Sequence, residues 1–236
     1  MAIYIYNGLP GSGKSTKLAS IALDLLEQNK RLFLKMASYG KPRRLVVSNM
    51  KFSKEIEKKY GYGTHESYIE YWDNLTDLIE YRHVDVIIDE VATYLDSTQW
   101  KEVPLSVKRW LQQHRHFGLD IFGSTQDFKT IDISMRRLVK KAWWVRKVIG
   151  SRDISTTLPD VKNPWGLVWL NEIPWEDFTN DAQDYKLSLF PEWLFITKKR
   201  TSCFDTTQDI LGSEYPALIH KVKYCKTCGF EKVSHT

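Results

Sequence analysis

The segment GLPGSGKST, residues 8–16, combines glycines, a lysine and hydroxyl residues in a spacing that suits an anion. It matches the pattern GxxxxGKS (Walker A), in which Gly8, Gly11 and Gly13 let the backbone curl so that consecutive N–H groups point inward. A helix that begins near Lys14 would direct its positive end toward the same point. The segment therefore predicts a phosphate-binding loop between a strand and a helix.

Side chains of this loop have expected tasks toward a nucleoside triphosphate. We expect Lys14 to reach the β- and γ-phosphates, the Ser15 hydroxyl to bind Mg²⁺, and Thr16 to support a neighbouring phosphate. ATP and Mg²⁺ are the cofactors that this chemistry implies. The predicted nucleotide-binding residues are Gly8, Leu9, Pro10, Gly11, Ser12, Gly13, Lys14, Ser15 and Thr16.

An acidic pair ends the apolar run HVDVIIDE. Mg²⁺ between two phosphates needs more negative charge than a serine hydroxyl supplies, and Asp89 is the expected second ligand. Glu90 would face the γ-phosphate and act as general base toward water. Aspartate followed by glutamate is typical of the additional-strand, catalytic-glutamate ATPases. Asp85 is a weaker metal candidate, because burial of an unpaired carboxylate in mid-strand is costly.

Two further side chains are candidates for chemistry at the γ-phosphate. Gln126 follows an apolar strand and could sense that phosphate or position water, the alternative being a purely structural hydrogen bond. Arg115, in QQHRHFG, could act as an arginine finger on a neighbouring subunit's nucleotide. A basic cluster that caps a helix explains Arg115 equally well, and Arg136 or Arg137 would suit the finger role too.

The segment HKVKYCKTCGFEKVSH contains four potential zinc ligands, namely His220, Cys225, Cys228 and His235. A CxxC pair followed by glycine is typical of half a zinc knuckle, and two cysteines with two histidines can close a tetrahedral site. The spacing between these residues is uncommon among zinc fingers, and Cys203 is a competing ligand. Structural Zn²⁺ and metal-free thiols are therefore both open.

A scaffold of alternating strands and helices would position these groups. Strands are expected at 2–6, 44–50, 83–89, 119–124 and 142–149, and helices at 14–28 and 104–117. This order indicates an α/β fold, a P-loop NTPase with a central, mostly parallel sheet flanked by helices. Charges within 142–149 suggest an edge strand. Residues 151–164 are the expected boundary between an ATPase core, 1–150, and a small C-terminal extension, 151–236.

Composition excludes a disordered chain and a membrane-embedded one. With 42% hydrophobic and 27% charged residues in 236, the chain has the balance of a globular protein. No apolar run approaches the roughly 20 residues that span a bilayer, and no leader is recognisable, so we expect a cytoplasmic location. The net charge is +5, and the basic run from Lys129 to Arg152 is either a solvated face or a surface for nucleic-acid phosphate.

Five segments together resemble the zonular occludens toxin (Zot) family: GLPGSGKST (8–16), VVSNM (46–50), VIIDEV (86–91), QHRHFGLDIFGSTQD (113–127) and MRRLVKK (135–141). The resemblance covers roughly residues 2–149, and its most specific part is HRHFGLDI with the following TQ. This family includes the assembly ATPases of filamentous phages. It is similar to the packaging and DNA-pumping ATPases of the FtsK and HerA group.

The resemblance implies a homo-oligomeric, ring-forming ATPase of a virus or prophage that drives genome packaging, DNA translocation or virion assembly. Its partners would be DNA, viral capsid proteins or both, in the cytoplasm of a host cell or with the virion. The residues that match the family's motifs are Lys14, Ser15, Asp89, Glu90, Gln126 and Arg115. Phage assembly members typically carry a membrane-spanning helix after the ATPase region, and this sequence shows none, which favours packaging over extrusion.

Two other functions are compatible with the loop. A small-molecule or nucleotide kinase shares it, and the basic run from Lys129 to Arg152 would then be the lid. The pair Asp89 and Glu90, followed by Gln126, argues against a kinase. A nucleotide-dependent interaction module with slow hydrolysis is barely separable from a motor by sequence.

Overall fold

One eight-stranded sheet forms the centre of the part of the protein that the structure describes. The computed structural model describes residues 1–36, 43–150, 166–173 and 192–196. The strand order is β3-β2-β4-β5-β1-β6-β7-β8; pairs from β3 to β6 are parallel, and β6, β7 and β8 pair antiparallel. The predicted α/β fold with a mostly parallel sheet is confirmed. The strands are β1 (Ile3–Asn7), β2 (Val46–Ser48), β3 (Ile69–Tyr71), β4 (Asp85–Ile88), β5 (Asp120–Thr125), β6 (Val139–Gly150), β7 (Gly166–Ile173) and β8 (Glu192–Ile196).

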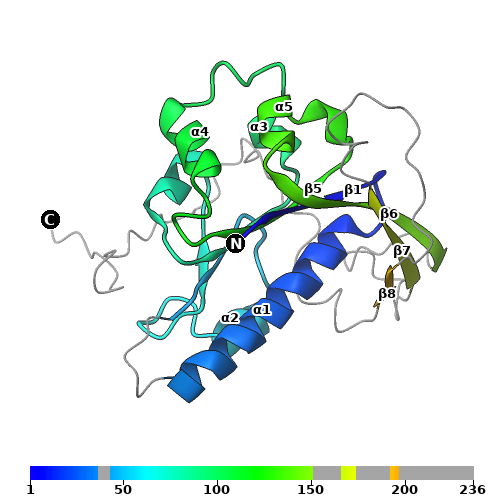
Figure 1. Cartoon of the computed structure of the whole chain (residues 1–236). Coiled ribbons are helices and arrows are strands. Elements are labelled where there is room, and N and C mark those ends of the chain that lie inside the picture. Colours follow the sequence, from blue (N-terminus) through cyan, green and yellow to red (C-terminus); the bar gives the residue numbers. More distant parts are fainter. Residues whose placement is uncertain (37–42, 151–165, 174–191, 197–236) are drawn as a thin grey trace, which may run out of the picture.

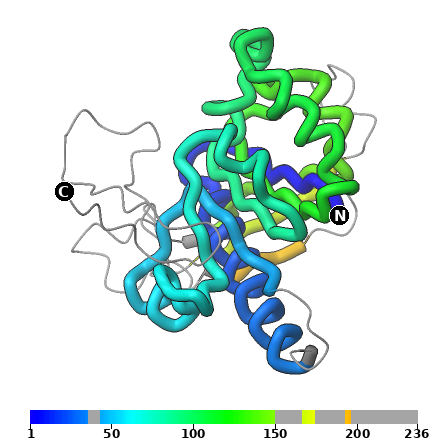
Figure 2. Tube along the Cα trace, turned by 90° about the vertical axis from the view of Figure 1, so that its left-hand side faces the viewer, coloured from blue at the N-terminus to red at the C-terminus, as the bar shows by residue number. Residues whose placement is uncertain are grey.

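Helices cover both faces of this sheet (Figure 1). On one face lie α1 (Lys14–Met36) and α2 (Lys54–Lys59), and on the other lie α3 (Ala92–Leu95), α4 (Leu105–Gln112) and α5 (Ile133–Arg136). Short 3₁₀ helices, η2 (Leu75–Glu80) and η3 (Phe128–Thr130), complete the connections. Figure 2 shows the same layers from the side, with blue α1 below and the green segment above. Covering on both faces explains the nearly continuous apolar sequences of the central strands.

The long helix α1 is held to the sheet by an apolar stripe. It continues to Met36, eight residues beyond the predicted end at Gln28, because neither glycine nor proline interrupts it before Gly40. The rings of Phe33 and Tyr68 meet edge to face, 6.3 Å between centroids, and anchor this extra length. The fully buried side chains of the stripe are Leu18, Ala19, Ala22 and Leu26.

The interior position of β6 shows that the prediction of an edge strand for residues 142–149 is wrong. This strand pairs with β1 on one side and with β7 on the other. One of its charges is matched across the sheet, since Lys141 Nζ lies 3.0 Å from Glu172 Oε2 of β7. β7 and β8 extend the sheet that residues 1–150 begin. The division of the chain at residue 150 stays a prediction.

Asp85, the weaker metal candidate, is a paired carboxylate at the amino end of β4. It is 2% exposed, and Arg44 Nη2 lies 2.6 Å from its Oδ1 and 2.8 Å from Asp120 Oδ2. Asn29 Nδ2 donates to Asp85 Oδ2 at 2.9 Å. Asp85 therefore holds α1, β4 and β5 together at the end of the sheet opposite the phosphate loop.

This ion pair gives a stability prediction. We expect Arg44→Met to lower the free energy of unfolding by about 2–4 kcal/mol, because it leaves the buried Asp85 carboxylate without its cation. The value lies below that of a fully buried pair because the Arg44 side chain is 29% exposed. Urea denaturation followed by circular dichroism measures it. Arg31→Met is the control, since Arg31 makes an exposed pair with Glu27; an equal, small loss in both variants would contradict the prediction.

Candidate active site

The phosphate loop lies between the carboxyl end of β1 and the first turn of α1, as the sequence predicts (Figure 1). Gly11 and Gly13 have φ angles of +72° and +97°, which glycine adopts at little cost. Gly8 meets a different demand, because a Cβ there would collide with the Val145 carbonyl oxygen. The Gly8 N–H donates to the Thr125 carbonyl at 3.2 Å and ties the loop to β5. Gly11 and Gly13 thus allow the loop to curve, and Gly8 allows it to pack directly against the sheet.

Lys14 is the first residue of α1 and is 5% exposed. Its Nζ donates to the carbonyl oxygens of Gly8 at 2.8 Å and Leu9 at 3.1 Å. Burial lowers the pKa of Lys14, and the nearby carboxylates of Glu90 and Asp89 oppose that shift. The ammonium group is therefore held inside the loop, within electrostatic reach of the acidic pair.

The hydroxyl residues of the loop fit a polyphosphate. Ser12 Oγ is buried and has no hydrogen-bond partner among the described residues. Thr16 is 4% exposed, and Ser15 is half-buried beside it. A buried hydroxyl without a partner is unfavourable, and a phosphate oxygen would satisfy it. Loop donors, Lys14 and the positive end of α1 all suit the same anion.

Asp89 follows β4 directly and is fixed by two other strand ends. Ser124 Oγ, at the end of β5, donates a hydrogen bond to Asp89 Oδ1. Asn49, just after β2, brackets the Asp89 backbone: its Oδ1 accepts from Asp89 N at 2.8 Å, and its Nδ2 donates to Asp89 O at 2.9 Å. The Asp89 carboxylate and the Ser15 hydroxyl are hard oxygen donors, so this donor set fits Mg²⁺.

Glu90 adopts a left-handed backbone conformation, with φ at +53°, which is uncommon for a residue other than glycine. Its N–H donates to Ser124 Oγ at 3.0 Å, and Gln126 Nε2 donates to Glu90 Oε1 at 3.3 Å. Burial raises the pKa of Glu90, Asp89 adds to the rise, and Lys14 and Gln126 oppose it. A half-buried carboxylate that is placed by a strained backbone and receives a directed hydrogen bond has the features of a positioned proton acceptor.

Ser124 and Asn49 are positioning residues that sequence analysis did not select. Ser124 is fully buried and binds both members of the acidic pair, and Asn49 holds the backbone of one of them. Each is a polar residue at the carboxyl end of an apolar strand. That signal is present in VVSNM and FGSTQ, but only the pairing of β2, β4 and β5 identifies what these side chains contact.

The role of Ser124 can be tested through stability. We expect Ser124→Ala to lower the free energy of unfolding by about 1–3 kcal/mol, because the Glu90 N–H and Asp89 Oδ1 lose their common partner. Chemical denaturation measures the loss. Ser134→Ala, at an exposed position of α5, is the matched control and should change little. Equal behaviour of the two variants would refute the assigned contact.

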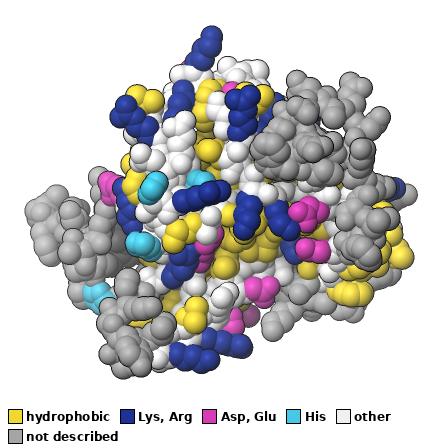
Figure 3. Space-filling model, in the orientation of Figure 1, with side chains coloured by type: hydrophobic (Ala, Val, Ile, Leu, Met, Phe, Trp, Pro, Cys, Tyr) yellow, Lys and Arg dark blue, Asp and Glu magenta, His cyan; other side chains and the backbone are white. Residues whose placement is uncertain are grey.

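Arg115 lies away from the loop of its own chain. Arg115 borders a cavity that Val139 also lines. Val139 pairs with Ile3 at the start of β1, so this cavity is at the amino end of the sheet. The loop, in contrast, follows the carboxyl end of β1. Figure 3 shows Lys, Arg and His side chains gathered on the face near α4. The cavity measures about 480 Å³ and is lined by Gln112, His114, Arg115, Arg137, Leu138, Val139 and Lys140.

The basic run from Lys129 to Arg152 is divided among several environments. Arg136 is buried, and Arg137 lines the cavity beside Arg115. Lys141 pairs with β7, as described above. Arg152 lies outside the described residues. Between residues 129 and 150, the basic side chains therefore do not share a single solvated face or a single phosphate-binding surface.

The predicted zinc ligands His220, Cys225, Cys228 and His235, and the competing Cys203, lie outside the described residues. Structural Zn²⁺ thus stays a prediction. In the described ranges, no three His, Cys, Asp or Glu side chains are close enough to hold a metal ion. Nor does any helix there combine the length and apolar character needed to cross a membrane.

A profile of the family named zonular occludens toxin (Zot) matches residues 2–166, well over half of the sequence. The chain belongs to the Zot family. Its predicted site residues Lys14, Asp89, Glu90 and Gln126 meet at one edge of the sheet, whereas Arg115 does not. No curated protein has a significantly similar sequence.

Solved structures similar to this Zot family member differ widely in sequence. The N-terminal domain of zonular occludens toxin from Neisseria meningitidis is 22% identical, with a TM-score of 0.47 over 86% of this chain and 98% of that one. The genome packaging NTPase B204 from Sulfolobus turreted icosahedral virus 2, in complex with ATP-γS, is 17% identical, with a TM-score of 0.39 over 61% and 74%. The flagellar accessory protein FlaH from Methanocaldococcus jannaschii is 12% identical, with a TM-score of 0.43 over 84% and 89%.

Proposed function

We propose that this Zot family member is a Mg²⁺-dependent P-loop ATPase that powers packaging of a viral or prophage genome, DNA translocation or virion assembly. One observation carries the hydrolase assignment. The buried Lys14 of the phosphate loop faces the pair Asp89 and Glu90, and Gln126 is hydrogen-bonded to Glu90. Membership of the Zot family supports the assembly or packaging role.

The residues of the site divide the chemistry among them. Loop N–H groups and Lys14 would hold the β- and γ-phosphates, and Ser15 and Asp89 would hold the metal. Bound Mg²⁺ would neutralise charge that develops on the phosphate oxygens. Glu90 would accept a proton from the attacking water, with Gln126 orienting its carboxylate. Ser124 and Asn49 would keep both acids in place.

The sheet order supports a catalytic-glutamate ATPase over a kinase. β5 lies between β1, which leads into the loop, and β4, which leads into the acidic pair. In the proposed subclass β5 would be the additional strand, and this strand order supports that assignment. The same order brings Gln126 beside Glu90. Half of the segment considered as a kinase lid is the interior strand β6, whose hydrogen bonds to β1 and β7 keep it in the sheet.

The basic cavity around Arg115 supports a homo-oligomeric ring. Since Arg115 and the phosphate loop are at opposite ends of the sheet, Arg115 would act on the nucleotide of an adjacent subunit, with Arg137 as the alternative finger. Mixing Arg115→Ala subunits with Lys14→Ala subunits tests this arrangement. Recovery of activity in mixed oligomers supports a finger in trans, and no recovery argues against it.

Turnover with and without DNA tests the proposed function as a whole. We expect single- or double-stranded DNA to stimulate ATP hydrolysis several-fold, as a DNA motor requires. Transfer of phosphate to a small acceptor at a comparable rate would favour the kinase instead. Slow hydrolysis that DNA does not change would favour a nucleotide-controlled interaction module, with capsid proteins or DNA as partners in the host cytoplasm or the virion.

A further inference from the structure

Another cavity, of about 450 Å³, lies against the phosphate loop. The loop supplies one wall with Leu9, Pro10, Gly11 and Ser12, and β6 supplies the other with Trp144, Val145, Arg146 and Lys147. The two walls are joined at Gly8, whose missing side chain allows the loop to sit directly on the Val145 carbonyl. The cavity is therefore continuous with the predicted phosphate site. The four β6 residues that line it have no role in the proposed hydrolysis step.

The direction of a bound nucleotide follows from the strand order. β5 and β4, which lead to Gln126 and Glu90, lie on one side of β1, and β6 lies on the other. If Glu90 acts on the γ-phosphate, as the proposed function requires, that phosphate points toward β4. The nucleoside at the other end of the triphosphate then extends toward β6, where the cavity is.

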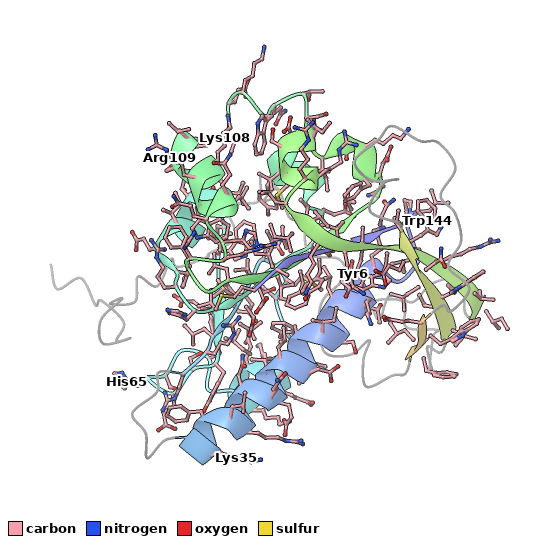
Figure 4. The ribbon with its side chains drawn as sticks, in the orientation of Figure 1. Tyr6, Lys35, His65, Lys108, Arg109 and Trp144 are labelled. Carbon is pink, nitrogen blue, oxygen red and sulfur yellow. The ribbon has the colours of Figure 1, made fainter. Side chains whose placement is uncertain are left out.

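The lining of the cavity suits a flat, weakly polar group. Trp144 is half-buried and pairs in register with Asn7, the last residue of β1 before the loop, so the sheet fixes its position relative to the phosphate site. In Figure 4, Trp144 and Tyr6 lie near the amino-terminal end of α1. Leu9, 66% exposed, provides an apolar surface on the opposite wall. An indole and an aliphatic side chain on two walls are the surfaces on which a nucleic-acid base stacks.

We propose that this cavity is the base subsite of the nucleotide site, and that it binds a purine by stacking on Trp144 with little discrimination between adenine and guanine. The inference rests on the proposed function. No acidic side chain is among the described residues that line the cavity, so none there accepts the ring and amino N–H groups that distinguish guanine. Its charged groups, Arg146 and Lys147, are donors, and N7 of either purine can accept from them. O6 of guanine can accept as well, but Arg146 is exposed, so such a bond competes with water and adds little. Stacking without such hydrogen bonds separates two purines poorly.

Calorimetry on the full chain with three probes tests the base subsite: Mg–ATP, Mg–GTP and inorganic tripolyphosphate, which has the phosphates but no base. For the unmodified protein we expect ATP and GTP affinities within about tenfold of each other. Trp144→Ala should weaken both nucleotides by roughly 5- to 150-fold and leave tripolyphosphate unchanged, whereas Trp144→Phe should restore most of the loss. Unchanged tripolyphosphate binding also shows that the variant is folded.

Two further variants complete the test. Trp193→Ala is the matched control, since Trp193 is 51% exposed on β8 and lies outside the cavity; it should change no affinity. Trp144→Leu keeps an apolar side chain at this half-buried position but removes the aromatic face, and it should weaken ATP several-fold but not tripolyphosphate. This second variant keeps the proposal testable if Trp144→Ala does not fold.

The outcomes separate the base subsite from the proposed function. Failure of all three probes to bind the unmodified protein overturns the nucleotide site itself. If all three probes bind the unmodified protein, and Trp144→Ala and Trp144→Leu change the affinities for ATP and tripolyphosphate by the same factor or not at all, the base subsite alone is overturned. ATP and GTP affinities that differ by more than about tenfold, in either direction, would overturn the claim of weak discrimination.

Discussion

Lys14→Ala is expected to reduce ATP hydrolysis by about 10²- to 10³-fold, the effect of removing a directed positive charge from a site where negative charge develops. The Lys14 ammonium is buried and is held by two loop carbonyls in reach of the acidic pair. An alanine has no group that could stabilise the β- and γ-phosphate oxygens. Binding of ATP and of tripolyphosphate should weaken as well.

Steady-state phosphate release and calorimetry measure these losses. Lys35→Ala is the matched control, because Lys35 belongs to the same helix but lies exposed at its far end (Figure 4). The control should keep full activity. If Lys14→Ala hydrolyses ATP as fast as Lys35→Ala, the phosphate loop is not the site of reaction.

Glu90→Gln is expected to lower the turnover number for ATP by about 10²- to 10⁴-fold while ATP still binds, because glutamine cannot accept a proton from water. The variant should therefore accumulate as an ATP complex. Single-turnover measurements and retention of radiolabelled ATP detect that state. Glu55→Gln, at an exposed position of α2, is the control. Equal loss of binding and turnover would point to a structural role for Glu90.

The same carboxylate gives a pH dependence with a definite sign. Since burial raises the pKa of Glu90, hydrolysis should fall on acidification at a higher pH than for an ordinary carboxyl group. Gln126→Ala removes a hydrogen bond that opposes the rise of the Glu90 pKa, so its hydrolysis rate should begin to fall at a still higher pH. The residual hydrolysis by Glu90→Gln should not show this fall on acidification. An acid limb at the usual carboxyl pKa of about 4.3 would contradict the assignment.

Stability should show the same ionisation in the nucleotide-free protein. A carboxyl group whose pKa is higher in the folded state binds its proton more tightly there than in the unfolded chain. Ionisation of Glu90 at neutral pH therefore costs stability, and that cost disappears below the pKa of the unfolded chain. We expect Glu90→Gln to unfold at a higher temperature than the unmodified protein at pH 7. Near pH 3 the two should agree.

The phosphate loop and the acidic pair were predictable from sequence because short stretches determine them. Loop glycines before Lys14, and the apolar period that follows, specify a strand, a turn and a helix start within about 30 residues. Asp89 and Glu90 end an apolar run, and the carboxyl ends of parallel strands share one edge of a sheet. The place of Gln126 beside Glu90 follows from the same rule, once β5 is put between β1 and β4.

Other assignments needed the pairing of distant segments. The charges in β6 suggested an edge, but residues 166–173 supply its second neighbour. Asp85 was judged a costly unpaired carboxylate, and its partner Arg44 is 41 positions earlier in the chain. The sequence gives no sign of what Ser124 and Asn49 contact. The pairing of β2, β4 and β5 places both side chains against Asp89. Arg115 shares no edge of the sheet with the loop, although its segment carried the most specific resemblance.

The sequence by itself determined the glycine-rich loop between strand and helix, the acidic strand end and the α/β class, since each depends on backbone geometry and periodicity over a few residues. Only the tertiary structure decided which side chains contact the acids, which carboxylate is a structural ion-pair partner, and which strands lie on either side of the loop. Those outcomes depend on which strands become neighbours, and strand order arises from packing between segments far apart in the chain.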